Sequence, residues 1–266
     1  MLINSRVILR HLTAAVLIAG ALTSAQAGQN CEEHPLTVAT VDASMRLAER
    51  TARALDASGA QVVVLARAGR NLDRYGLRWS HLGYAYREGG NGRWLVVHKL
   101  NACGTAEGRL YRQGLGEFFL DGMTRYEAAY SVPSADLQAR LLPILSEPAR
   151  ALALQHRPYN MVAYPWSTRY QQSNQWALET LAMAAEPTVR TRERAQAWLR
   201  FQGYQPTVLQ VGALERLGAR VGTAHIAFDD HPNGERYSDR IATVTVDSVY
   251  AFLATRGLAG PVQLVS

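Results

Sequence analysis

Cysteine and long apolar segments are scarce in this chain of 266 residues, which contains only two cysteines. After residue 27, no apolar run approaches the roughly 20 residues that a membrane-spanning helix needs. The chain also lacks sequence repeats, glycine-rich phosphate loops and basic stretches with interleaved aromatic residues. These absences argue against stable membrane insertion after residue 27, and against nucleotide or nucleic-acid binding. No cofactor and no metal are expected.

The first 27 residues have the pattern of a secretory signal peptide. Arg6 and Arg10 form a basic segment, residues 12–22 are apolar, and residues 25–27 read Ala-Gln-Ala. This order predicts cleavage before Gly28 and a periplasmic or secreted protein. A retained membrane anchor is the alternative. We expect the remaining residues, 28–266, to form a single domain.

The two cysteines are Cys31 and Cys103, 72 positions apart. In an exported protein, an even pair predicts one disulfide. In the chain-entropy model, a loop of this length would stabilise the fold by roughly 4 kcal/mol. A free catalytic Cys103 and a metal site are the alternatives. A metal site is disfavoured because no histidine pair stands at ligand spacing.

Hydrophobic periodicity predicts an α+β fold, with a small antiparallel sheet and packed helices. Strands are concentrated in the first half, and residues 104–116 read as a loop. We expect strands over 61–67, 79–87, 93–100, 126–132 and 241–246, and helices over 43–57, 135–145, 171–185, 192–201, 211–217 and 247–255. Ser134 and Asp247 are the expected caps of two of these helices.

Two histidines stand on the strands of a predicted β-hairpin. The turn is Gly89-Gly90-Asn91-Gly92, and His81 and His98 lie on either side of it. A four-residue loop places His98 on the diagonal from His81, about 7–8 Å away and on the same face. A six-residue loop places them directly opposite, and a loop of three or five residues separates them onto different faces. Both histidines could equally be ordinary strand residues.

The segment Ser80-His81-Leu82-Gly83-Tyr84 resembles the His-Val-Gly-Ile strand of the circularly permuted papain-like (NlpC-type) hydrolases. The resemblance covers about residues 60–185, which would form a permuted papain-like core, with a helical C-terminal extension over about 190–266. It implies that His81 is a base and that His98 orients it. Ser173 then takes the position of the usual cysteine nucleophile, at the start of a helix.

The whole chain more closely resembles a group of exported proteobacterial proteins known as a domain of unknown function, number 2145. That resemblance rests on residues 164–170 and 173–176 and supplies no activity. Four aromatic residues in these segments are candidates for a substrate groove, with core packing as the alternative: Tyr164, Trp166, Tyr170 and Trp176.

The expected function is hydrolysis or transfer at an amide or ester bond of an envelope peptide or lipid, with attack by Ser173. The alternative is a non-catalytic binding module that keeps a papain-like cleft. Serine in place of cysteine favours the module, and retention of both histidines favours the enzyme. Ser173 could also be a helix cap, or lie in the second turn if Thr168 and Gln171 form a capping box.

Two further sites are expected to be structural. Residues 229–234, Asp-Asp-His-Pro-Asn-Gly, include metal-ligand residue types, but the Pro-Asn-Gly core is typical of a solvated turn. His225 lies in an apolar run and is expected to be a packed strand residue.

Overall fold

The computed structural model describes residues 36–90, 92–102, 104–222 and 225–266. The predicted signal peptide, Cys31 and Cys103 therefore lie outside the described residues. The chain folds as α+β, as the sequence predicts. In chain order the helices are α2 (Val38–Ala57), η1 (Asp73–Tyr75, a 3-10 turn), α3 (Leu115–Leu120), α4 (Ala135–Ser146), α5 (Pro148–Ala151), α6 (Ser173–Ala185), α7 (Arg192–Phe201), α8 (Ala213–Gly222), α9 (Asn233–Arg236) and α10 (Val246–Thr255).

The described residues form one large antiparallel sheet and one small one. The strands are β1 (Val62–Ala68), β2 (His81–Arg87), β3 (Trp94–Asn101), β4 (Gly108–Gly114), β5 (Arg125–Ser131), β6 (Thr207–Gln210), β7 (Arg240–Thr243) and β8 (Gln263–Val265). The large sheet has the order β4-β3-β2-β1-β5-β8, and β6 pairs with β7. Every pair is antiparallel.

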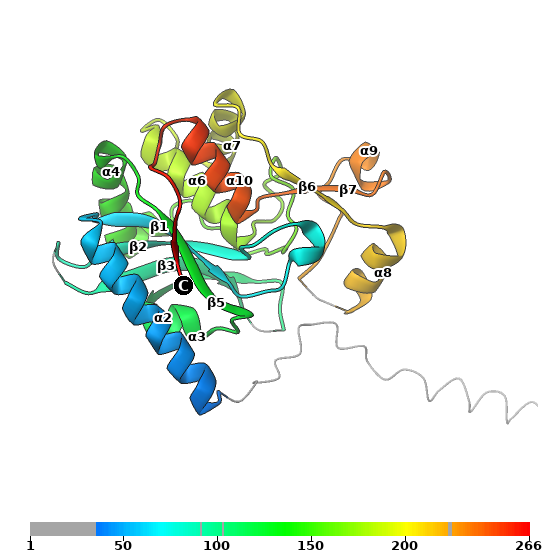
Figure 1. Ribbon diagram of the computed structural model, residues 1–266. Helices are drawn as coiled ribbons and strands as arrows, with labels where there is room; N and C mark the ends of the chain where they lie inside the picture. Colours follow the sequence, from blue (N-terminus) through cyan, green and yellow to red (C-terminus); the bar gives the residue numbers. More distant parts are fainter. Residues whose placement is uncertain (1–35, 91, 103, 223–224) are drawn as a thin grey trace, which may run out of the picture.

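Helices cover both faces of the large sheet. Figure 1 shows α2 and α3 on one face and α4, α6 and α10 on the other. Two apolar clusters match these two layers, because alternate strand residues point to opposite faces. Leu82 and Tyr84 of β2 belong to the cluster of α6, whereas Ala85 belongs to the cluster of α3. We call these the α6 face and the α3 face.

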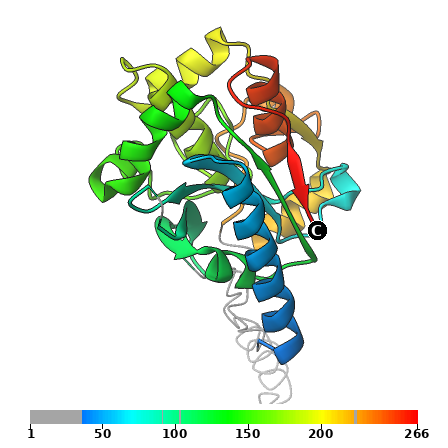
Figure 2. The same cartoon turned by 60° about the vertical axis from the view of Figure 1, so that its left-hand side comes forward.

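The C-terminal region is joined to the same sheet. Strand β8 pairs with β5, as Figure 2 shows, and the hydroxyl of Tyr250 on α10 donates to the carbonyl oxygens of Val64 and Ala129. The small β6–β7 sheet has its own apolar cluster, which includes Leu209, Phe228 and Ile241.

The predicted elements differ from the structure mainly at residues 104–116, for which the sequence pattern predicts a loop. Gly108–Gly114 instead forms the edge strand β4, whose residues are largely polar and partly exposed. Edge strands tolerate this composition because only one side of the backbone is paired. Of the two predicted helix caps, one is confirmed: Ser134 accepts a hydrogen bond from the Leu137 N–H at the start of α4. The other is wrong, because Thr245 and not Asp247 caps α10.

Candidate functional site

The two hairpin histidines are hydrogen-bonded to each other. The β2–β3 register pairs Tyr84 with Val97 and Arg87 with Trp94, which is the register of the predicted four-residue loop. The Nε2 atom of His81 lies 2.9 Å from Nδ1 of His98. The prediction that they share one face of the hairpin is therefore confirmed.

The pair lies on the α3 face of the sheet. The ring centroid of Phe118 on α3 is 5.1 Å from that of His98 and 6.0 Å from that of His81. His98 is fully buried, and His81 keeps an exposed fraction of 8%. Gly83 makes room for the pair, because a Cβ atom at this position would lie 2.8 Å from the His98 Cβ.

Burial keeps both imidazoles neutral. Burial, followed by the charge of the Arg67 cation, lowers the pKa of His98 from 6.5 to about 4. The pKa of His81 is lowered well below 6.5, first by burial and then by Arg67 and His98. At neutral pH each ring thus carries one N–H and one lone pair.

Arg67 is the cation of this site. It is the β1 residue paired with His81. Its side chain is nearly buried, lies over the Phe118 ring, and donates to the Phe118 carbonyl oxygen and to the Asp121 carboxylate. Burial lowers the pKa of Arg67, and Asp121 opposes that effect.

A third residue completes the hydrogen-bonded chain. Gln113 of β4 presents its Oε1 atom 2.7 Å from Nε2 of His98. The sequence does not indicate Gln113, because the polar segment that forms β4 has the pattern of a loop. Only the β3–β4 register of the folded sheet, which pairs Gln113 with Val96, brings Gln113 next to His98.

Ser173 does not join the histidines. It is the first residue of α6, and α6 packs on the α6 face, so the sheet separates its side chain from the imidazoles. Its hydroxyl lies 3.3 Å from the Tyr159 hydroxyl, and its exposed fraction is 6%. The predicted triad of Ser173, His81 and His98 is therefore not assembled in this structure. The physical reason is strand alternation: Leu82 and Tyr84 face α6, so His81 faces away from it.

Ser173 is also not a side-chain cap of α6. The N-cap is Gln172, which makes no side-chain capping bond. The Thr168–Gln171 capping box is absent as well, because both residues precede α6, and Gln171 Oε1 accepts instead from Lys99 Nζ and the His156 N–H.

Lys99 is the only lysine in the chain, and it is fully buried on the α6 face. Its Nζ donates to the His156 carbonyl oxygen at 2.6 Å and to Gln171 Oε1 at 2.7 Å. Burial, followed by the Arg192 charge, lowers the pKa of Lys99 from 10.5 to about 6. A neutral amine with two N–H donors matches these two oxygen acceptors.

A buried ion pair lies next to Lys99. Arg192 of α7 donates to both carboxylate oxygens of Glu179, at 2.8 and 3.1 Å. Arg192 also donates to the carbonyl oxygens of Thr168 and Tyr170. This network fixes the segment that leads into α6.

The four aromatic groove candidates do not gather around one site. Trp176 is fully buried in the core, where its ring meets Tyr84 edge-on. Trp166 packs against Tyr204, Tyr164 against His231, and the Tyr170 hydroxyl donates to Asp229. The predicted groove is therefore wrong for Trp176, and the other three aromatic residues have separate partners.

Residues 229–234 are not a simple solvated turn. The side chains of Asp230 and His231 are fully buried, and the Asp230 carboxylate accepts from the Tyr164 N–H and pairs with His231 Nδ1. The other His231 nitrogen, Nε2, faces the Ala242 carbonyl oxygen at 3.0 Å. His225 is buried as expected, but it lies in a turn and not in a strand.

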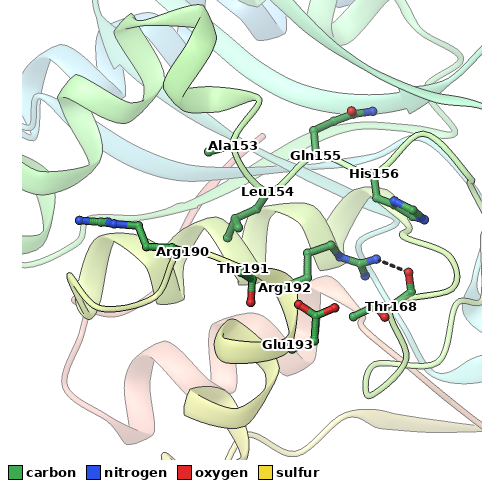
Figure 3. Close-up of a pocket in the computed structure, with 9 residues that line it drawn as sticks. All are labelled: Ala153, Leu154, Gln155, His156, Thr168, Arg190, Thr191, Arg192 and Glu193. Atoms are coloured by element: carbon green, nitrogen blue, oxygen red, sulfur yellow. Dashed lines mark hydrogen bonds between the residues drawn. The ribbon is translucent and has the colours of Figure 1, made fainter.

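A polar pocket of about 350 Å³ lies at the start of α7 (Figure 3). Its walls include His156, Thr168, Arg190, Arg192 and Glu193. Arg190 points away from the other lining side chains, and Arg192 is bonded to Thr168. None of the predicted site residues lines this pocket.

The described part of the chain contains neither a metal-ligand cluster nor a membrane-spanning helix. Within it, no cluster of three or more His, Cys, Asp or Glu side chains could hold a metal ion. None of the helices formed by these residues combines the length and apolar character required to cross a bilayer.

Comparison with known proteins identifies a family. The family model described as "Uncharacterized protein conserved in bacteria (DUF2145)" matches residues 54–253, so the chain belongs to this family. No curated protein and no solved structure matches the chain. The resemblance to papain-like hydrolases thus has no support from these comparisons.

Proposed function

We propose that this protein hydrolyses an ester or amide bond, with His81 as the general base that activates water. The observation that carries the proposal is the hydrogen-bonded chain from Gln113 through His98 to His81. A buried histidine pair is costly to keep unless it is hydrogen-bonded, and oriented neutral imidazoles are the usual bases of hydrolases. Ser173 has no part in this mechanism.

The proton transfers follow from the lone pair of His81. Nδ1 of His81 has no hydrogen-bond partner among the described residues, while its Nε2 faces His98. Nδ1 removes a proton from water as the water oxygen bonds to the carbonyl carbon. The tetrahedral intermediate then breaks its C–O or C–N bond, and His81 returns the proton to the leaving group. His98 stabilises the transient imidazolium because it accepts the Nε2–H.

A kinetic comparison of three variants tests the proposal. The mature chain is assayed on short ester and amide substrates, with His81→Ala, Ser173→Ala and, as a matched histidine control, His156→Ala. Activity should fall at least about a hundredfold in His81→Ala, the usual size of a general-base contribution. It should stay near the parent level in the other two. Activity that depends on Ser173 and not on His81 would overturn the proposal.

The second candidate is a non-catalytic binding module. One observation favours it: Ser173, which stands where the resembling enzymes carry their nucleophile, is bonded to Tyr159 and separated by the sheet from both imidazoles. If the parent protein turns over none of the substrates, and fluorophosphonate labels no serine, the module is the better explanation.

Export is part of the proposal. The basic and apolar pattern of residues 1–27 supports a periplasmic or secreted site, and therefore an envelope peptide or lipid as substrate. Mass spectrometry of the protein from cell fractions tests this. A mature N-terminus at Gly28 in the periplasm or medium is expected, and an uncut cytoplasmic chain would contradict it.

A further inference from the structure

We propose that Gln113 is a positioning residue that sets the tautomers of both histidines and thereby leaves the lone pair of His81 on Nδ1. The inference rests on the proposed function for its catalytic meaning. Its structural content can be measured without any activity.

The first step concerns Gln113 and His98. The Oε1 atom of Gln113 can only accept a hydrogen bond, so the Nε2 atom of His98, 2.7 Å away, must carry the proton. The neutral ring of His98 then has its lone pair on Nδ1.

The second step concerns the two histidines. Because Nδ1 of His98 is an acceptor, the Nε2 atom of His81, 2.9 Å away, must be the donor. A neutral His81 has one proton, so its Nδ1 is left with the lone pair. The donor and acceptor of both hydrogen bonds, from Gln113 to His98 and from His98 to His81, therefore depend on which end of the Gln113 amide faces His98.

The third step concerns the position of Gln113. It lies on the edge strand β4, which pairs with β3 from Leu95–Gly114 to Asn101–Gly108. The long pairing fixes the backbone of Gln113 relative to His98. A reversed amide would present its N–H₂ to His98, turn every hydrogen bond around and place a proton on Nδ1 of His81, which would then be unable to act as a base.

Substitutions at Gln113 distinguish the two possible donor–acceptor directions of these hydrogen bonds. Glutamate supplies only acceptors and should keep the native direction. Leucine removes the partner, and lysine supplies only donors, so it should reverse the direction. The measurement is the ¹⁵N NMR signature of each imidazole, which distinguishes protonated from unprotonated ring nitrogens. Arg112→Leu, at the neighbouring position of β4, is the matched control.

The parent and Gln113→Glu should show protonated Nε2 on both rings, whereas Gln113→Leu should show mixed tautomers. Gln113→Lys should show protonated Nδ1. Circular dichroism first verifies that each variant is folded. Identical tautomers in the parent, leucine and lysine variants would then overturn the inference. If the tautomers change as expected but the parent has no hydrolase activity, the proposed function fails and the positioning role stands. Where activity exists, kcat should fall about tenfold or more in Gln113→Leu, with KM little changed.

Discussion

Gly83 of β2 and His98 of β3 are in such close contact that a single added carbon would collide with the histidine. A Cβ atom on Gly83 would lie 2.8 Å from the His98 Cβ and 2.9 Å from the Val97 carbonyl oxygen. The absence of a side chain at position 83 is therefore a condition for the histidine pair to form.

The first prediction follows from this contact. Gly83→Ala should destabilise the protein by about 1–3 kcal/mol, the usual cost of overpacking a closed core, and should displace His98 from His81. Urea denaturation measures the first effect and imidazole NMR the second. Gly218→Ala is the control, because Gly218 lies in α8 with open space around it. An alanine there should leave stability unchanged or raise it by up to about 1 kcal/mol. Equal stability of the two variants would contradict the packing argument.

The second prediction concerns acid sensitivity. In the unfolded chain His98 takes up a proton near its ordinary pKa of 6.5, but in the folded protein it does so only near 4. Between these pH values the unfolded state binds more protons, so stability falls as the pH is lowered. For a shift of this size, the loss attributable to His98 is about 3 kcal/mol between pH 7 and pH 4.

The measurement for the second prediction is the free energy of unfolding of the parent and of His98→Asn across this range. The parent should lose more stability than the variant on acidification. The double variant with His81→Asn should be flatter still, because the pKa of His81 is lowered as well. Parallel curves for the parent and His98→Asn would show that the histidine is not held neutral.

Local sequence features predict the histidine pair but not the residue that orients it. The Gly/Asn turn and the two-residue period of the strands are local features, and they correctly place His81 and His98 together. Gln113 was not predictable in the same way, because an edge strand with polar residues has no strong strand pattern. The fold class followed from periodicity, but the six-strand order depends on contacts distant in sequence, such as β8 with β5.

The sequence also does not predict that the sheet separates Ser173 from the histidines. A helix start and two strand histidines were predicted correctly as local elements. Which face of the sheet receives the helix depends on the side chains that alternate along β2, and both faces of β2 are buried. Because apolar residues of β2 point to both sides of the sheet, the sequence pattern alone does not predict which face α6 covers. Tyr84, whose hydroxyl donates to the Ala177 carbonyl oxygen of α6, identifies the chosen face in the structure.

The third prediction uses the only lysine of the chain. Lys99 is fully buried, with a pKa near 6 instead of 10.5, so it is largely neutral above pH 7. Lys99→Arg should be strongly destabilising, by roughly 3 kcal/mol or more, because a guanidinium cannot lose its proton and an uncompensated buried charge is costly. Lys99→Met replaces the ionisable amine with an uncharged side chain and should be better tolerated than arginine at neutral pH.

The pH dependence supplies the check on Lys99. Between about pH 6 and 10.5 the unfolded chain holds one more proton on this residue, so the parent should gain up to about 1.4 kcal/mol of stability per pH unit from it. Lys99→Met should lack that contribution when unfolding is followed in urea from pH 6.5 to 9. A parent and a methionine variant with the same slope would show that Lys99 stays charged in the folded protein.

The last prediction concerns Ser173→Cys. In a papain-like site, a cysteine at this position would be paired with an imidazole, and its thiol would react rapidly near neutral pH. Here the side chain is 6% exposed, has the Tyr159 hydroxyl as partner, and lies across the sheet from His81. The introduced thiol should therefore react with iodoacetamide more slowly than a cysteine in the unfolded chain, by about tenfold or more. The rate is measured on the variant before and after denaturation, with the parent protein as the background for Cys31 and Cys103. A rate that is faster in the folded protein, and that is lost in the double variant with His81→Ala, would show that positions 173 and 81 meet in solution and that the sheet does not separate them.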